Sequence, residues 1–112
     1  MAAARLRDLP RRRVGATEVP VATAFRSRLL GLSGLSREQA GAGLLIPRCA
    51  SVHTFGMRFE LDLVFLDADD RVLAVCLGVP PRRLTWRRGA SAVLEVPTPQ
   101  GGEFRGRRDL GG

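Results

Sequence analysis

The only histidine of the chain, His53, is the first side chain to weigh for chemistry. An imidazole has an unperturbed pKa of about 6.5, so beside a suitable partner it could transfer protons near neutral pH. Cys49 lies four residues upstream, and four residues of extended chain span about 13 Å. A cysteine–histidine catalytic pair would therefore require this segment to coil. Without a partner, His53 would be a structural or surface residue.

Asp62 interrupts the apolar run Leu61–Leu66 and is the second candidate. Burying a carboxylate costs several kcal/mol unless the group is paired or hydrogen-bonded. One interpretation is a structural salt bridge or a cap at the strand end. The other is a site carboxylate that works with His53 as an acid–base pair. The partners that the sequence offers are Arg58, Arg26 and His53.

Two other positions stand within apolar runs. Glu95 interrupts the run Ala92–Val96, and its simplest interpretation is a solvent-facing position on an edge strand. Cys76 lies within the run Val72–Leu77 and is most simply a small buried hydrophobe.

The segment Arg82–Arg88 combines four arginines with the only tryptophan. Arginine clusters beside an aromatic ring can hold phosphates or stack on bases. The alternative, which we favour, is a solvated loop after Pro80 and Pro81 with Trp86 folded back on the core. The candidate contacts to a polyanion are Arg82, Arg83, Trp86, Arg87 and Arg88.

The sequence offers no metal or cofactor site that we can identify. Zinc sites need three or four ligands, whereas the chain has one histidine and two cysteines without a CxxC spacing. Walker A, GxGxxG and GxSxG motifs are absent from the sequence. We expect no metal and no cofactor, and the sequence leaves open whether the protein is an enzyme.

The composition describes an ordinary small domain with a strongly basic balance. The chain has 112 residues, 45% of them hydrophobic, and a formal net charge of +7. All 18 basic residues are arginine, and lysine and asparagine are absent, a bias that a GC-rich genome explains. The net charge favours weak, salt-sensitive contact with polyanions rather than specific nucleic-acid recognition.

The chain lacks the apolar segments that targeting would need. No run approaches the roughly 18 apolar residues of a membrane span, and the basic residues 1–13 are followed by no apolar region of a secretory signal. Unpaired cysteines suit a reducing compartment. We therefore expect a cytoplasmic protein without a membrane partner.

Local signals predict two short helices and then strands. Thr23 can cap a helix that runs through Leu30 and stops at Gly31, and Ser36 with Gln39 forms a capping-box pattern. The runs 61–66 and 72–77, joined by the acidic turn 67–70, predict a β-hairpin. Both runs are apolar on both faces, so we expect a central hairpin covered on each side. Further strands are expected over 44–46, 51–54 and 92–96.

These elements predict an α+β protein: a single compact domain of mainly antiparallel β-sheet, barrel- or sandwich-like, with short N-terminal helices. We expect a flexible arm over 1–10, one domain over 11–96, and a Gly/Arg-rich irregular tail over 97–112.

Four blocks of the sequence resemble a widespread prokaryotic family, the domain of unknown function 192. The blocks are residues 22–32, 51–58, 61–67 and 92–96, and the resemblance spans about Val14 to Val96. It implies a compact domain of antiparallel strands with short helices, and it implies no activity. The family motifs map onto Arg26, Arg28, Gly31, Thr54, Met57, Leu61, Asp62, Phe65 and Glu95.

Several positions depart from the family pattern. Ser33 stands where members commonly have methionine, Asp70 stands where the hairpin turn commonly has glycine, and the tail 101–112 is rich in glycine and arginine. A missing last strand would expose a sheet edge and favour self-association.

The function stays unknown at this stage, and our first hypothesis is a small binding or accessory module with a polar pocket beside the hairpin. Arginine offers a fixed fork of donors, so the ligand would be small and polar or anionic. The alternatives are an acid–base enzyme that uses Asp62 and His53, and an arginine-rich binder of polyanions or nucleic acids. The candidate pocket residues are Arg26, Arg28, His53, Thr54, Met57, Asp62 and Glu95.

Overall fold

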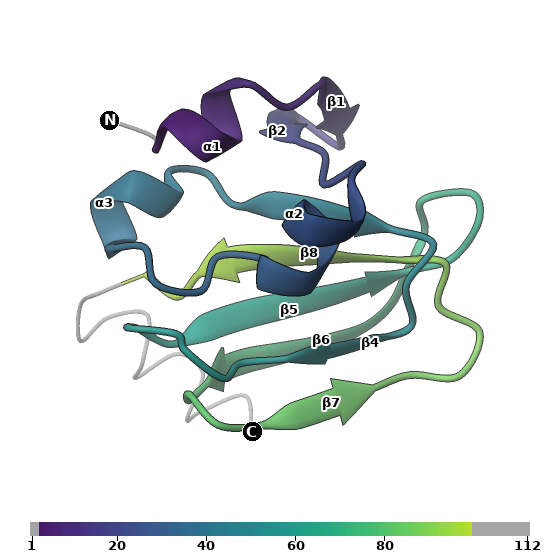
Figure 1. Ribbon diagram of the computed structural model, residues 1–112. Helices are drawn as coiled ribbons and strands as arrows, with labels where there is room; N and C mark the ends of the chain where they lie inside the picture. Colours follow the sequence, from purple (N-terminus) through teal and green to yellow (C-terminus); the bar gives the residue numbers. More distant parts are fainter. Residues whose placement is uncertain (1–2, 100–112) are drawn as a thin grey trace.

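In the described part of the chain, three short helices and a β-hairpin precede six further strands, four of which form the main sheet (Figure 1). The protein is described by a computed structural model that covers residues 3–99, without the side chains of Phe25 and Arg26. In chain order the elements are α1 (Ala4–Arg7), β1 (Arg11–Val14), β2 (Thr17–Pro20), α2 (Phe25–Leu30), α3 (Arg37–Ala40), β3 (Leu44–Pro47), β4 (Ser51–His53), β5 (Leu61–Leu66), β6 (Val72–Val79), β7 (Leu84–Trp86) and β8 (Ala92–Pro97).

The main sheet has the strand order β3-β8-β5-β6, and every neighbouring pair is antiparallel. Its two faces bury different sets of side chains, because residues alternate along each strand. One face, here called the helical face, packs Ile46, Leu63 and Phe65 against the helical segments and β4. The opposite face, here called the hairpin face, packs Leu45 and Leu66 against the β1–β2 hairpin.

Two further pairs, β1–β2 and β4–β7, form separate two-stranded sheets. In Figure 1 the β1–β2 hairpin lies toward the β3 edge of the main sheet, and β7 lies at the β6 side. The sheets do not join into a closed barrel within residues 3–99. The α+β class, the antiparallel pairing and the short helices are confirmed, and the barrel alternative is wrong.

The predicted hairpin forms, but its second strand is not covered on both faces. β5 lies between β8 and β6, whereas β6 is an edge strand. Leu73, Val75 and Leu77 of β6 are 42–50% exposed. The β1–β2 hairpin reaches the sheet beside β3, where Val21 bridges Leu45, so the hairpin face of β6 stays open. The expected coverage holds for β5 and is wrong for β6.

The two predicted helices are present. In α3 the Ser36 hydroxyl accepts the Gln39 N–H at 3.2 Å, and the Gln39 side chain accepts the Ser36 N–H at 2.9 Å, which completes the capping box. The N-cap of α2 is Ala24, one residue after the predicted cap Thr23, because the Ser27 hydroxyl accepts the N–H of Ala24.

Within the N-terminal stretch predicted as a loose arm, residues Ala4–Arg7 form the helix α1, which packs against the core. Leu6 of α1 is only 2% exposed, and the Arg5 guanidinium donates to the carbonyls of Gly31 at 3.1 Å and Ser33 at 2.6 Å. The arm therefore adds to the core and contacts the turn after α2. The last part of the predicted tail, residues 100–112, lies outside the described residues.

No helix in residues 3–99 is both long and apolar enough to cross a membrane.

Candidate functional site

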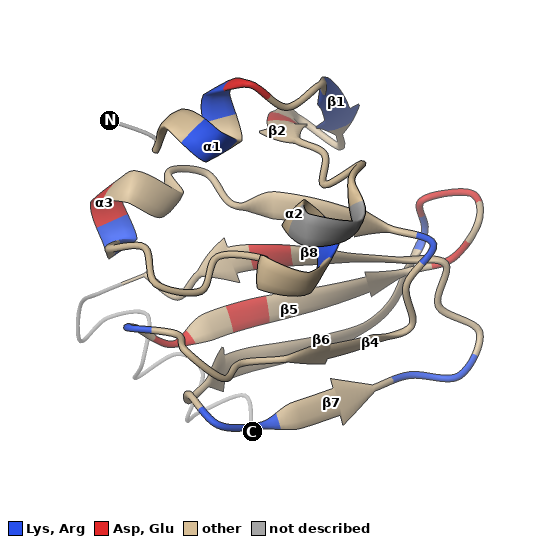
Figure 2. Cartoon of the chain, viewed as in Figure 1, with Lys and Arg blue, Asp and Glu red and all other residues tan. Residues whose placement is uncertain are grey.

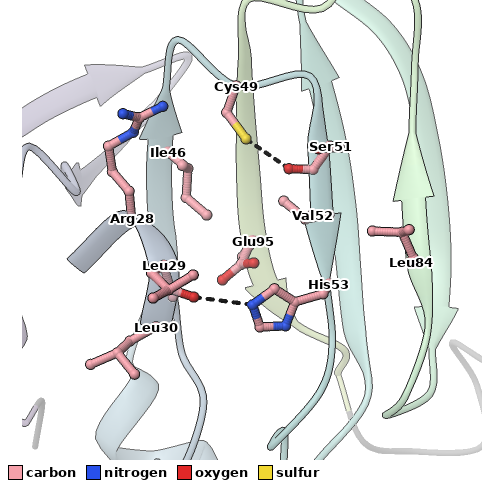
Figure 3. Close-up of a pocket in the computed structure, with 11 residues that line it drawn as sticks. Arg28, Leu29, Leu30, Ile46, Cys49, Ser51, Val52, His53, Leu84 and Glu95 are labelled. Atoms are coloured by element: carbon pink, nitrogen blue, oxygen red, sulfur yellow. Dashed lines mark hydrogen bonds between the residues drawn. The ribbon is translucent and has the colours of Figure 1, made fainter. Parts of the chain in front are cut away.

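A pocket of about 180 Å³ opens between α2 and β4, over the helical face of the sheet (Figure 3). One wall comes from the last turn of α2 and the other from β4. The bottom is formed by Ile46 of β3 and Glu95 of β8. The lining residues are Arg28, Leu29, Leu30, Gly31, Ile46, Cys49, Ser51, Val52, His53, Leu84 and Glu95.

Three buried side-chain atoms in the described part of the chain have no hydrogen-bond partner, and all three belong to this pocket. They are Arg28 Nε, His53 Nδ1 and Glu95 Oε1. Buried polar atoms in native proteins almost always have a partner, which is often an ordered water or a ligand. The pocket thus gathers unused hydrogen-bonding capacity that the rest of the described core does not show.

Glu95 is the deepest polar group of the pocket, with 3% of its surface exposed. Burial raises the pKa of its carboxyl group from 4.5 to about 7, against the opposing effect of the hydrogen bond from the Leu32 N–H. The carboxyl group is therefore largely protonated below neutral pH. The prediction of a solvent-facing position on an edge strand is wrong, because β8 lies between β3 and β5.

Gly31 lets the chain pass close to this carboxyl group. A Cβ on Gly31 would lie 2.8 Å from Oε1 of Glu95, and the residue has a φ of +54°. Only glycine fits both the space and the backbone conformation. The turn that ends α2 can therefore lie directly against the carboxyl group of Glu95.

His53 joins the two walls of the pocket. Its Nε2 lies 3.1 Å from the carbonyl oxygen of Leu29, which can only accept, so Nε2 carries the hydrogen. In the neutral ring Nδ1 then keeps its lone pair and can accept a hydrogen bond from a bound molecule. The ring also contacts that of Phe55, with 5.8 Å between the ring centroids.

Arg28 brings a permanent positive charge to one end of the pocket (Figure 3). Its terminal Nη2 donates to the carbonyl of Arg48 at 2.9 Å, which leaves Nε unused. At the same end the Cys49 thiol donates to the Ser51 carbonyl at 2.7 Å (Figure 3). Cys49 and His53 line the same pocket, but each has a different backbone oxygen as partner.

Asp62 has a structural role away from this pocket. Its Oδ1 accepts the N–H of Gly78 at 2.8 Å and the hydroxyl of Thr98 at 2.7 Å. These contacts hold the irregular register of β5 and β6 between Leu61 and Leu63. In the β5–β8 ladder Leu63 pairs with Glu95, and the preceding residue, Asp62, pairs with Val96. Because successive side chains of a strand point to opposite faces, Asp62 points to the hairpin face.

The predicted acid–base pair of Asp62 and His53 is therefore wrong in its geometry. The two residues share no hydrogen bond, and Asp62 lies on the sheet face opposite to the one that carries the pocket. The carboxyl group that shares the pocket with His53 is that of Glu95.

Two of the other predicted pocket residues, Thr54 and Met57, have structural roles. Thr54 is fully buried, and its hydroxyl donates to the Pro80 carbonyl at 2.7 Å and accepts the Arg83 N–H at 2.8 Å. Met57 belongs to the core. The side chain of Arg26 lies outside the described residues.

The arginine-rich segment contains a three-residue strand, and its four arginines lie in the connections on either side of it. Residues Leu84–Trp86 make β7, which pairs with β4. Trp86 is 68% exposed, so the expectation that it folds back on the core is wrong. Basic positions flank this strand at both ends, while α1 and the β1–β2 hairpin carry others (Figure 2). Arg82, Arg83, Arg87 and Arg88 are exposed.

Nowhere in residues 3–99 do three or more histidine, cysteine or acidic side chains gather in a way that could hold a metal ion. What the pocket does offer is a neutral acid, an imidazole acceptor and a guanidinium donor between apolar walls. Each of these groups can hydrogen-bond to a polar molecule in the pocket.

Comparison with known families agrees with the resemblance of the sequence blocks. The family model DUF192, described as an uncharacterized ACR, matches residues 9–104. The chain belongs to the DUF192 family. No curated protein is similar enough in sequence to count as a match.

A solved structure with the same fold is that of a protein of unknown function from Novosphingobium aromaticivorans. The two chains are 17% identical, each is covered over 88% of its length, and the TM-score is 0.58. At this identity the likeness shows the fold alone. Every pocket residue of our protein lies within the DUF192 match.

Sequence reasoning proposed three residues that do line the pocket, namely Arg28, His53 and Glu95. It missed the apolar walls, such as Leu29 and Ile46, because their contacts depend on how α2 packs over the sheet. A usable signal was present at Glu95, where an acid interrupts an apolar strand, but that strand was predicted at the edge of the sheet, whereas β8 lies between β3 and β5.

Proposed function

We propose that this DUF192 protein is a binding module that holds a small carboxylate in the pocket of Arg28, His53 and Glu95. The observation that carries the proposal is the gathering of three unpartnered buried polar atoms at one pocket. Each atom lacks a partner that a bound group could supply.

The chemistry of the three groups favours an anion. Arg28 gives a fixed positive charge and an unused N–H donor. The protonated carboxyl group of Glu95 can donate its O–H to a ligand oxygen. His53 can accept from, or when protonated donate to, the same group.

The size and the walls of the pocket limit the ligand further. Its volume of about 180 Å³ lies below the roughly 300–1,000 Å³ of pockets for drug-sized molecules. Leu29, Ile46 and Leu84 contribute apolar surface. A carboxylate on a short aliphatic group matches both features.

Binding fits the arrangement better than catalysis does. A nucleophile needs an adjacent base that activates it, whereas the Cys49 thiol donates to the Ser51 carbonyl and His53 Nε2 donates to the Leu29 carbonyl. We further propose a cytoplasmic location, which suits the two free cysteines.

The test is a titration of ¹⁵N-labelled protein with sodium acetate, followed by NMR, with acetamide as the neutral counterpart. We expect acetate to bind with a Kd of about 1 mM and to shift the amide signals of Leu32 and His53. Affinity should fall as the pH rises through about 7, where Glu95 ionises.

Variants make the test specific. His53→Ala and Arg28→Ala should each weaken acetate binding by about tenfold, as expected for the loss of one hydrogen bond. Arg83→Ala, which removes an exposed arginine outside the pocket, should not. Equal binding of acetate by all four proteins, or equal binding of acetamide, would show that the pocket does not recognise a carboxylate.

A further inference from the structure

Large exposed hydrophobic side chains gather around His53. Leu84 is the register partner of His53 across the β4–β7 pair, so the two side chains share one face of this ribbon. Trp86 lies two residues further along β7 and shares the same face. The Phe55 ring contacts the His53 ring, and the Leu29 carbonyl accepts a hydrogen bond from His53 Nε2. The term apolar patch is used below for Leu29, Phe55, Leu84 and Trp86.

The apolar patch is open to solvent. Leu29 and Phe55 are 56% and 54% exposed, and Leu84 and Trp86 are 62% and 68% exposed. The other face of the β4–β7 ribbon is packed, because Val52 is only 6% exposed and belongs to the core. Exposed apolar patches of this kind mark contacts with a partner surface.

Arginines stand at both ends of the β4–β7 ribbon (Figure 2). At one end the Arg82 N–H donates to the Thr54 carbonyl, next to Phe55 of the patch. At the other end the Arg87 N–H donates to the Ala50 carbonyl, which brings the connection after β3 beside the connection after β7. The arginines of these two ends are all exposed, namely Arg48, Arg82, Arg83, Arg87 and Arg88.

The segments that build this surface contain no acidic residue. They are residues 25–30, 48–58 and 82–88 of the sequence. The turn 67–70, by contrast, carries three aspartates. An apolar centre between two positive ends is complementary in charge and in polarity to a partner that is both anionic and apolar.

A lipid bilayer fits this description better than a nucleic acid does. Proteins hold single-stranded nucleic acids by stacking bases on aromatic rings between basic residues, but Leu29 and Leu84 have no ring to stack. Leucine, phenylalanine and tryptophan beside basic residues are the side chains that lie at the boundary of headgroups and acyl chains in an anionic bilayer. The ring of Trp86 suits this boundary, because it is apolar with one polar N–H.

We infer that the apolar patch and the arginines beside it bind the surface of an anionic lipid bilayer. The patch side chains enter the headgroup region, and the arginines contact lipid phosphates. This inference goes beyond carboxylate binding and does not depend on it. It departs from the sequence expectation of no membrane partner, which considered only continuous apolar runs. The surface is built from three separate short segments, and the protein lies on the bilayer rather than crossing it.

The test is co-sedimentation with vesicles of phosphatidylcholine that contain about 30 mol% phosphatidylglycerol, compared with vesicles of phosphatidylcholine alone. We expect binding to the anionic vesicles and little binding to the neutral ones. The emission of Trp86, the only tryptophan, should shift to shorter wavelength on binding. An increase in ionic strength from about 0.1 M to about 1 M should weaken binding at least tenfold, because salt screens the arginines.

A matched pair of double variants tests the position of the charge. Arg87→Ala with Arg88→Ala should weaken binding to anionic vesicles about tenfold. Arg11→Ala with Arg13→Ala removes the same charge from exposed positions of β1, which lies over the hairpin face of the sheet. This control should weaken binding by less than about threefold, as expected for the loss of net charge alone.

A second matched pair tests the apolar contact. Trp86→Ala should weaken vesicle binding severalfold, whereas Leu73→Ala, which removes an exposed leucine of β6, should leave it unchanged. None of these substitutions changes a residue that lines the pocket. Acetate binding should therefore stay intact in every variant, which keeps this inference separate from the proposed function and also shows that the variants are folded.

Three results would overturn the inference. The first is equal binding to neutral and anionic vesicles. The second is an equal loss of binding in the two double-arginine variants, which would mean that net charge and not this surface is responsible. The third is salt-sensitive binding of a single-stranded RNA without binding of anionic vesicles, which would assign the surface to nucleic acids. The acetate titration decides the carboxylate site in each case.

Discussion

Two buried carboxyl groups, Asp62 and Glu95, lie on adjacent strands of one sheet and have opposite surroundings. Asp62 pairs with Val96, and the next residue, Leu63, pairs with Glu95. The two acids thus stand one register step apart and point to opposite faces. In Figure 2 each is an acidic segment within an otherwise uncharged strand.

The difference between them lies in hydrogen bonding rather than in burial. Asp62 is 8% exposed and accepts two hydrogen bonds from neighbouring segments. Glu95 is 3% exposed, receives the Leu32 N–H, and leaves Oε1 without a partner. A buried acid with its full set of donors stabilises the fold. A buried acid that lacks donors can hydrogen-bond to a ligand, and burial raises the pKa of its carboxyl group.

The largest effect is expected from Asp62→Ala. The substitution leaves the Gly78 N–H and the Thr98 hydroxyl without their acceptor, and each orphaned donor costs about 1–3 kcal/mol. We expect the free energy of unfolding to fall by about 4 kcal/mol in urea denaturation at pH 8. Glu95→Gln should be neutral or stabilising under the same conditions. An equal loss of unfolding free energy in both variants would mean that the two acids contribute to stability in the same way.

A slightly smaller effect should appear in the pH dependence of stability. The pKa of Glu95 is about 7 in the folded protein and 4.5 in the unfolded chain, so the folded state holds the extra proton between these values. The free energy of unfolding should therefore fall as the pH rises from about 4.5 to about 7, by about 3 kcal/mol in total.

Urea denaturation across this pH range measures the fall, with Glu95→Gln as the control. The variant has no proton to lose at this position, so its stability should decline less over the same window. Parallel curves for the two proteins would mean that the carboxyl group is not desolvated.

An intermediate effect is expected at Gly31. Gly31→Ala introduces a Cβ 2.8 Å from the Glu95 carboxyl group at a φ of +54°, whereas Gly34→Ala has a φ of +80° and open space. Both variants carry backbone strain of about 1–3 kcal/mol. Only Gly31→Ala should also change the pH profile and weaken acetate binding. If the two variants differ in neither respect, the turn after α2 does not shape the acid site.

The smallest effect is expected from Arg58→Ala. Arg58 was one of the partners predicted for Asp62, but it is exposed, and the recorded acceptor contacts of Asp62 are to Gly78 and Thr98. The free energy of unfolding should change by no more than about 0.5 kcal/mol. A larger loss in thermal or urea denaturation would indicate that Asp62 depends on a charged partner after all.

Local signals in the sequence were sufficient to predict most of the helices and strands, but they did not predict the order of the strands in the sheet. The capping box at Ser36 and the hairpin after Leu61 depend on residues close in sequence, and both are present. The insertion of β8 between β3 and β5 depends on contacts between distant segments. That placement turns Glu95 from a predicted surface residue into the deepest polar group of the pocket.

The sequence likewise predicted several residues of the candidate site but not where they meet. Arg28, His53 and Glu95 were singled out by residue type, but their meeting point was placed beside Asp62. Residue type shows that a buried acid needs donors, and only the sheet register shows which acid receives them.

The N-terminal arm has a practical meaning for anyone who shortens or tags this protein. Arg5 holds the carbonyls of Gly31 and Ser33, and the residue between them, Leu32, supplies the N–H that Glu95 accepts. Arg5 thus braces the turn above an acid that is 90 residues away in the sequence. A deletion that removes Arg5 therefore takes away a support of the Glu95 pocket, and a ligand screen should use a chain that keeps this residue.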